Sequence, residues 1–245
     1  MKICLQGGHE GRTSGSTGAP GEKEFNIDIS NQVAFELSKR GFQVQRVNAD
    51  PKPEEIGGDW DLFLAIHYDA DIYGKGGGFV DFPEPSTDGA TKESQRIAYL
   101  IRQEYFGTTK IVSHPERVNA NTKYYYMWKL MSAKTPCVLI ECGVGMHVPD
   151  DHEVLAFHRP LVVEGIVKGI CLAFNVPYVT PPTPSLPPEA PQNPPSEPTT
   201  QPDTSLSLIV ELSNLRDLVG TIKGKIWGRG FVWSRMNKLK ELLPK

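Results

Sequence analysis

Two short runs of apolar residues constrain the fold of this chain more than any other feature of its sequence. Residues 138–140 (Val-Leu-Ile) lead into Glu141, and residues 62–66 (Leu-Phe-Leu-Ala-Ile) lead into His67. A continuous apolar run of this length is typical of a strand buried on both faces, as in a parallel sheet covered by helices. The chain is therefore predicted to form an α/β domain whose strands carry polar residues to their carboxyl ends, where such sheets place their chemistry.

The rest of the N-terminal part alternates strand and helix patterns in the same way. The expected strands are 2–5, 42–47, 61–66, 138–143 and one leaving the glycine turn at 76–78. The expected helices begin at Glu22 and end before Gly41, run over 91–105, and run from a capping Asp150 or Asp151 through to Phe174. The predicted fold class is α/β, a twisted, mostly parallel sheet flanked by helices and followed by a proline-rich linker and a short helical tail.

A change of composition divides the chain into three parts. Between Pro177 and Pro202 lie 11 of the 21 prolines, among Thr, Ser, Gln and Glu, with little to bury. Such a stretch is typical of an extended linker. The sequence therefore predicts a catalytic domain over 1–176, a linker over 177–204 and a basic amphipathic tail over 205–245. The four cysteines (Cys4, Cys137, Cys142 and Cys171) have no CxxC spacing and are predicted to be buried free thiols.

Three polar residues are candidate ligands for a metal ion. His9 follows the first strand, His67 follows a buried strand, and Glu22 opens the first helix. Each alone has an ordinary explanation, since a histidine there is more often a structural residue and the helix dipole favours a carboxylate in the first turn. Together, two imidazoles and one carboxylate are the ligand set of a catalytic zinc site with water in the fourth position. Glu141 is then a candidate general base.

These candidates belong to motifs that resemble a known family. The motifs are Gly7-Gly8-His9-Glu10-Gly11, Glu22-Lys23 with Asn26 one turn on, Ile66-His67-Tyr68-Asp69-Ala70, Gly78-Phe79 and Pro136-Cys137-Val138-Leu139-Ile140-Glu141. In this order, over residues 1 to about 175, they resemble the zinc-dependent N-acetylmuramoyl-L-alanine amidases, which include many phage endolysins and bacterial cell wall hydrolases. The resemblance implies that His9, Glu22 and His67 bind Zn²⁺ and that Glu141 is the catalytic carboxylate.

The sequence departs from the family pattern at several positions. Gln6-Gly7 stand where the family usually has Asp-Pro, so a contact from that Asp is expected to be missing. Asp69 replaces a usual Asn and adds a negative charge. Glu24 lies close to Glu22, but Glu22 has the family's spacing of four residues to the helix Asn. The family often has an Arg before the penultimate strand, and Arg117 is the nearest candidate, although a surface position is the expectation for it.

The expected function is hydrolysis of the bond between N-acetylmuramic acid and L-alanine in peptidoglycan, by a phage endolysin. This choice of bond comes from the resemblance, because the residues alone indicate only metal-assisted amide hydrolysis. Two alternatives remain, a zinc peptidase or amidohydrolase acting on soluble muropeptides or peptides, and a cell wall binding module without turnover. Residues 124–126 (three tyrosines) line a substrate groove or pack on a half-buried strand, and His147 is a further candidate ligand.

The expected partners are peptidoglycan and, through the tail, an anionic wall polymer or membrane surface, but no nucleic acid. The tail from Ser205 has a net charge of +5, against −8 for the residues before it. Apolar residues recur at heptad spacing over 208–226, which favours self-association, although a docking helix is an alternative. No apolar signal segment opens the sequence, and no run of about 18 apolar residues occurs. Synthesis in the cytoplasm without a signal peptide is therefore expected, with action on the wall after release.

Overall fold

The computed structural model describes residues 1–13, 18–69, 76–83, 92–118, 120–123, 125–145 and 148–179. All of these residues belong to one unit of the chain, Met1–Pro181. The expected linker over 177–204, apart from its first three residues, lies outside the described residues. The expected tail over 205–245, Tyr124 and His147 lie outside them as well.

Five strands form one sheet in the order β2-β1-β3-β5-β4. Their bounds are β1 Lys2–Gly7, β2 Gln43–Val47, β3 Leu62–Asp69, β4 Phe79–Asp81 and β5 Cys137–Val144. All neighbouring pairs are parallel except β4 and β5, which are antiparallel at one edge. The predicted α/β fold class, a mostly parallel sheet flanked by helices, is confirmed.

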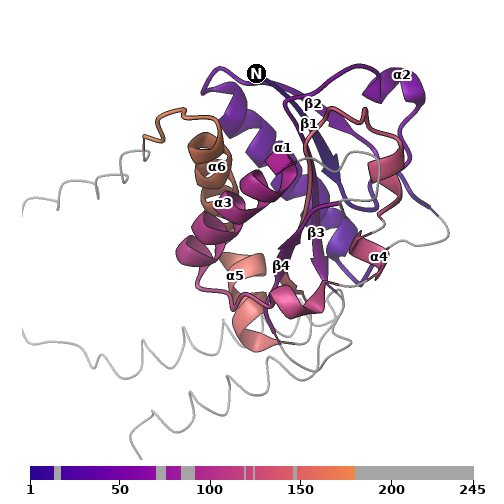
Figure 1. The fold of residues 1–245 in the computed structure, drawn as a ribbon. Coiled ribbons are helices and arrows are strands. Elements are labelled where there is room, and N and C mark those ends of the chain that lie inside the picture. Colours follow the sequence, from indigo (N-terminus) through magenta and orange to yellow (C-terminus); the bar gives the residue numbers. More distant parts are fainter. Residues whose placement is uncertain are drawn as a thin grey trace, which may run out of the picture. The chain divides into compact units, whose positions relative to one another are not determined.

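Three long helices and the short α5 (Pro149–Phe157) cover one face of this sheet, and the other short helical segments lie on the opposite side (Figure 1). The long helices are α1 Glu22–Ser38, α3 Lys92–Thr109 and α6 Arg159–Ala173. The shorter segments are α2 Pro53–Ile56, η1 Pro115–Arg117, α4 Ala120–Lys123, η2 Tyr126–Lys129 and α5 Pro149–Phe157. In α1 the apolar residues spaced four apart, which predicted the helix, are all buried: Phe25, Ile29, Val33 and Leu37.

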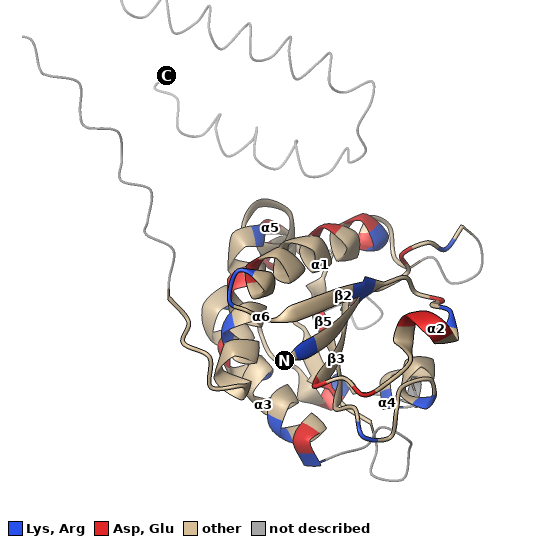
Figure 2. Cartoon of the chain, turned by 90° about the horizontal axis from the view of Figure 1, so that it is seen from above, with Lys and Arg blue, Asp and Glu red and all other residues tan. Residues whose placement is uncertain are grey.

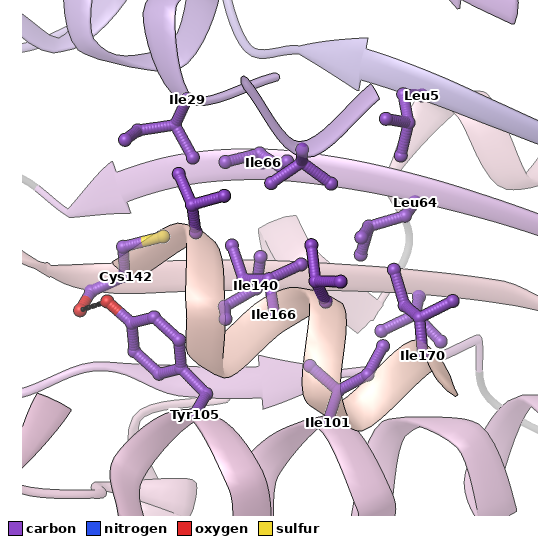
Figure 3. Close-up of a cluster of buried hydrophobic side chains, with 14 of the residues drawn as sticks. Leu5, Ile29, Leu64, Ile66, Ile101, Tyr105, Ile140, Cys142, Ile166 and Ile170 are labelled. Carbon is purple, nitrogen blue, oxygen red and sulfur yellow. Dashed lines mark hydrogen bonds between the residues drawn. The ribbon is translucent and has the colours of Figure 1, made fainter. Parts of the chain in front are cut away.

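Alternate residues of the central strands enter two separate cores, because successive side chains of a strand point to opposite faces. Even-numbered residues of β3 and β5, such as Leu64 and Ile140, pack against α1, α3 and α6 (Figure 3). Odd-numbered residues, such as Phe63 and Leu139, pack with Trp128 of η2 on the opposite face. Burial on both faces accounts for the unbroken apolar runs. It also places the odd-numbered His67 and Glu141 on the η2 side of the sheet.

Helices α3 and α6 approach each other closely at two glycines of α6. A β-carbon on Gly165 would lie 2.8 Å from the Cα of Tyr105, and one on Gly169 would lie 2.5 Å from the Cα of Ile101. Tyr105 is fully buried at this contact, and its hydroxyl donates a hydrogen bond of 2.8 Å to the carbonyl of Cys142 (Figure 3). This bond ties α3 to β5 one residue beyond Glu141.

The single helix predicted from Asp150 or Asp151 to Phe174 is wrong, because the structure has two helices there, α5 and α6. Pro160 lies in the first turn of α6. A proline inside one continuous helix would remove a backbone hydrogen bond and clash with the preceding turn. It is tolerated at a helix start, where the missing N–H has no partner in any case.

Charged residues lie mainly on the helices and loops around the sheet (Figure 2). All four cysteines are buried free thiols, as predicted. Within the described ranges, none of the helices combines the length and apolar character that crossing a membrane requires.

Candidate metal centre

The centre of the sheet contains a point where the chain connections leave in opposite directions. From β1 the chain passes through α1 to β2 on one side, whereas β3 lies on the other side of β1. Open α/β sheets bind ligands at such a point, outside the carboxyl ends of the strands. His9 follows β1, and His67 lies near the end of β3, so both reach this region. The backbone φ of His9 is 61°, in the left-handed region that is rare outside functional sites for residues other than glycine.

His9, Glu22 and His67 converge there. Glu22 Oε1 lies 3.1 Å from His9 Nε2 and 3.0 Å from His67 Nδ1. One ligand atom of each of the three residues lies within 4.8 Å of the others. Glu22 is 4% exposed, whereas Glu24 is exposed to solvent, so the structure brings Glu22 and not Glu24 to the two imidazoles.

The carboxylate of Glu22 is held by the first turns of the loop and helix around it. Its Oε2 accepts a hydrogen bond of 2.8 Å from the Ala19 amide, and Oε1 accepts one of 3.3 Å from the side chain of Asn26. Burial by itself raises the pKa of Glu22, but the interactions with the two imidazoles beside it, those of His67 and His9, outweigh burial and lower the pKa to about 2. Glu22 is therefore an anion at neutral pH, as a metal-binding carboxylate must be.

Glu141 lies beside this group, because it is the register partner of His67 on the adjacent parallel strand. Both side chains point to the same face of the sheet. Among the described residues, the buried Oε2 of Glu141 has no hydrogen-bond partner. Burial raises the pKa of Glu141 well above its usual value, and the negative charges of Glu22 and Asp69 raise it further. A partly buried carboxyl group with one buried, unused oxygen is typical of a functional position.

The donor set fits a zinc ion. Two imidazole nitrogens and one carboxylate oxygen are zinc ligands, and three protein ligands leave a fourth position open. Three carboxyl groups also lie near one another, those of Glu22, Asp69 and Glu141, and the charges of the first two disfavour ionisation of the third. A divalent cation would reduce their mutual repulsion.

Tyr125 precedes η2 and Tyr126 begins it, so the alternative of a half-buried strand is wrong for these two residues, and Tyr124 lies outside the described residues. Tyr126 begins η2, and Trp128 is buried in the second core. Tyr125 lies against His67, with its hydroxyl oxygen 3.2 Å from His67 Nε2. Composition indicated an aromatic cluster near the site, but no sequence signal distinguished Tyr125 from its neighbours.

Arg117 is buried, and the expectation that it lies at the surface was wrong. It is 6% exposed and donates hydrogen bonds to the carbonyls of Gly76 (2.8 Å) and Gly77 (3.1 Å). These glycines precede β4, which pairs with β5 at Phe79 and Glu141. Arg117 therefore holds the backbone that leads into β4, the strand that lies beside Glu141.

The prediction that Asp150 or Asp151 caps α5 is wrong. The residue before α5 is Val148, which makes no side-chain cap. Asp151 instead is 4% exposed and accepts hydrogen bonds from the amides of Gly77 and Val144. It thus joins the glycine turn to the end of β5. Its backbone partners are brought to it only by the fold, and no local pattern indicated them.

We expect Gly8→Ala to displace His67 and weaken metal binding. A β-carbon on Gly8 would lie 2.3 Å from the His67 ring, which is too close for any side chain. Because ligand positions tolerate only about 0.5 Å of displacement, the affinity for zinc should fall by roughly tenfold or more. Competition with a chromophoric chelator measures this affinity.

Gly107→Ala in α3 is the matched control for this variant. A β-carbon there meets nothing within 4 Å. Alanine is the better helix former, so this variant should keep the zinc affinity and gain about 0.5 kcal/mol of stability. Equal zinc affinity of both variants would contradict the close contact between Gly8 and His67.

Comparison with known families identifies one that spans most of the chain. A family model described as N-acetylmuramoyl-L-alanine amidase matches residues 3–171. This range includes His9, Glu22, His67 and Glu141. No curated protein is similar enough in sequence to count as a match.

Several solved structures have a similar fold. The N-acetylmuramyl-L-alanine amidase Ami1 from Mycobacterium smegmatis is 20% identical, with a TM-score of 0.57 over 71% of this chain and 97% of that one. The N-acetylmuramoyl-L-alanine amidase from Clostridium difficile 630 is 23% identical, with a TM-score of 0.54 over 71% and 96%. The catalytic domain of the CD27L endolysin, which targets Clostridia difficile, is 19% identical, with a TM-score of 0.50 over 74% and 99%.

Proposed function

Because this chain belongs to the N-acetylmuramoyl-L-alanine amidase family, whose substrate is peptidoglycan, we propose that it is a zinc-dependent enzyme that cleaves the amide bond between N-acetylmuramic acid and L-alanine. His9, Glu22 and His67 are the proposed zinc ligands, and Glu141 is the proposed catalytic carboxylate. The observation that carries this proposal is the convergence of the three ligand atoms within 4.8 Å of one another, beside the register partner of His67.

The proposed roles follow from the chemistry of each group. When bound, zinc polarises the scissile carbonyl and lowers the pKa of a water molecule toward neutrality. Glu141 accepts a proton from the attacking water as the oxygen adds to the carbonyl carbon. It then gives that proton to the nitrogen of L-alanine as the carbon–nitrogen bond breaks. The products are a free carboxyl group on the lactyl ether of the sugar and a free amino group on the peptide.

Glu141 is suited to both transfers. Glu141 is partly exposed, so water can reach it, while its buried Oε2 has no other hydrogen-bond partner among the described residues. A raised pKa favours a carboxyl group that must carry a proton between two steps near neutral pH. A zinc cation beside it would lower this pKa from its metal-free value.

We further propose an endolysin role, in which the protein reaches the cell wall after release from the cytoplasm. Support comes from the fold shared with the catalytic domain of the CD27L endolysin.

Digestion of purified cell walls tests the proposed bond. The full chain, loaded with zinc, should release peptides with new N-terminal L-alanine and create no new reducing sugar ends, as read by mass spectrometry and a reducing-end assay. Treatment with a chelator should abolish release, and added zinc should restore it.

Other products would overturn the proposal. New reducing ends would indicate a glycosidase, and cleavage within the stem peptide would indicate a peptidase. Wall binding without any product would indicate a binding module. Activity that resists complete removal of metal would contradict the zinc requirement.

A further inference from the structure

Three polar side chains, those of Gln6, Tyr125 and His67, connect the backbone after β2 with the candidate metal centre through successive hydrogen bonds. The Gln6 side chain lies at the end of β1, and its Nε2 is 3.1 Å from the carbonyl of Asn48 and 3.3 Å from that of Ala49. Gln6 Oε1 is 2.6 Å from the hydroxyl of Tyr125, and that hydroxyl is 3.2 Å from His67 Nε2.

The two carbonyls determine which end of the Gln6 amide faces which partner. A carbonyl oxygen only accepts hydrogen bonds, so the NH₂ end of Gln6 must face Asn48 and Ala49. The oxygen end therefore faces Tyr125 and accepts the proton of its hydroxyl. A phenol hydroxyl ordinarily loses its proton only near pH ~10, so the Tyr125 hydroxyl carries its proton at neutral pH.

The direction of the Tyr125 bond in turn determines the proton position on His67. Because the Tyr125 hydroxyl donates to Gln6, its oxygen is left to accept a hydrogen bond from His67 Nε2–H. A neutral imidazole carries only one N–H, so Nδ1 then keeps its lone pair. This is the nitrogen that faces Glu22 Oε1 at 3.0 Å. In the alternative tautomer, Nδ1–H would donate to Glu22 and block its own use as a ligand.

We propose that Gln6 and Tyr125 are positioning residues that hold His67 in the tautomer whose Nδ1 is free to bind a metal ion. Hydrogen bonds to the second nitrogen of a ligating histidine orient the ring in this way. The inference rests on the proposed function, because it assigns these residues a purpose at the zinc site.

Gln6 makes contacts of its own at the position where the family usually has Asp. It has four hydrogen-bonding contacts, including one with Tyr126. A carboxylate at position 6 would turn an oxygen toward the carbonyls of Asn48 and Ala49, where it would be repelled. The amide is therefore the group that satisfies both ends of this position.

The test combines zinc affinity with the proton position on His67 in the full chain. Tyr125→Phe removes only the hydroxyl and should weaken zinc binding by roughly 10- to 100-fold, as loss of such an outer contact typically does. Tyr99→Phe is the matched control, because its hydroxyl lies on the exposed side of α3, where it accepts a hydrogen bond from Gln103. It should change the affinity little. Gln6→Met should weaken zinc binding about as much as Tyr125→Phe does. Because the two residues act through one network, the double variant should bind zinc no more weakly than either single variant.

Nuclear magnetic resonance of ¹⁵N-labelled histidine supplies a readout that needs no variant to fold. In the metal-free wild-type chain, at a pH where the imidazole is neutral, the His67 proton should lie on Nε2, and in Tyr125→Phe this preference should weaken. A proton on Nδ1 in the wild type would overturn the inference, as would equal zinc affinity of Tyr125→Phe and Tyr99→Phe. If the wild type binds no zinc at all, it is the proposed function that fails.

Discussion

Glu141→Gln is expected to lower peptidoglycan hydrolysis by roughly 10²- to 10⁴-fold, the usual contribution of a general acid–base group, while zinc stays bound. Glutamine has nearly the same shape as glutamate, but it cannot accept the proton of water or return it to the leaving nitrogen. Glu141 is not among the three converging ligand residues, so its replacement should leave the metal site intact. Release of N-terminal L-alanine from purified walls measures the rate, and metal analysis measures the zinc content.

Asp69→Asn provides a matched acid-to-amide control for this prediction. Asp69 also lies on a central strand, and it raises the pKa of Glu141 through its charge. Its replacement introduces the residue that the family usually has there, so most of the activity should remain. If Glu141→Gln hydrolysed walls as fast as Asp69→Asn does, Glu141 would have no role in proton transfer.

Glu22→Gln is expected to remove zinc and with it all measurable hydrolysis. The amide carries no negative charge to balance the cation, and its NH₂ end cannot act as a ligand. The zinc affinity should fall by more than the roughly 10- to 100-fold that is typical when a residue hydrogen-bonded to a metal ligand is replaced. Zinc at 100 times its dissociation constant stabilises a protein by about 2.7 kcal/mol. Thermal unfolding with and without zinc should show this gain in the wild type and not in Glu22→Gln.

Glu24→Gln is the matched control, since Glu24 lies in the same first turn of α1 and is exposed to solvent. This variant should keep both the zinc-dependent stabilisation and the activity. Loss of zinc in Glu24→Gln with retention in Glu22→Gln would contradict the ligand assignment. The pair thus tests directly which carboxylate of this turn binds the metal.

Local patterns were sufficient for the central strands and the first long helix, but not for every helix boundary or for the contacts between elements. The apolar spacing of α1 and the unbroken runs of β3 and β5 depend on neighbouring residues, and all three elements appear where they were predicted. The break between α5 and α6 was missed, although Pro160 was a visible local signal. The burial of Arg117 and Asp151 was missed for a different reason, because the backbone groups that pair with them lie far away along the chain.

What the sequence determined by itself is the placing of a histidine or a carboxylate at three strand ends, His9, His67 and Glu141, and of Glu22 at a helix start. Only the tertiary structure decided that β1 lies next to β3 and β3 next to β5, which brings these ends together. Strand order depends on how the helices pack across the whole sheet, and no short stretch of sequence encodes it. The link from Gln6 through Tyr125 to His67 was likewise decided by the fold, because hydrogen-bond direction depends on atoms that only the folded chain brings into contact.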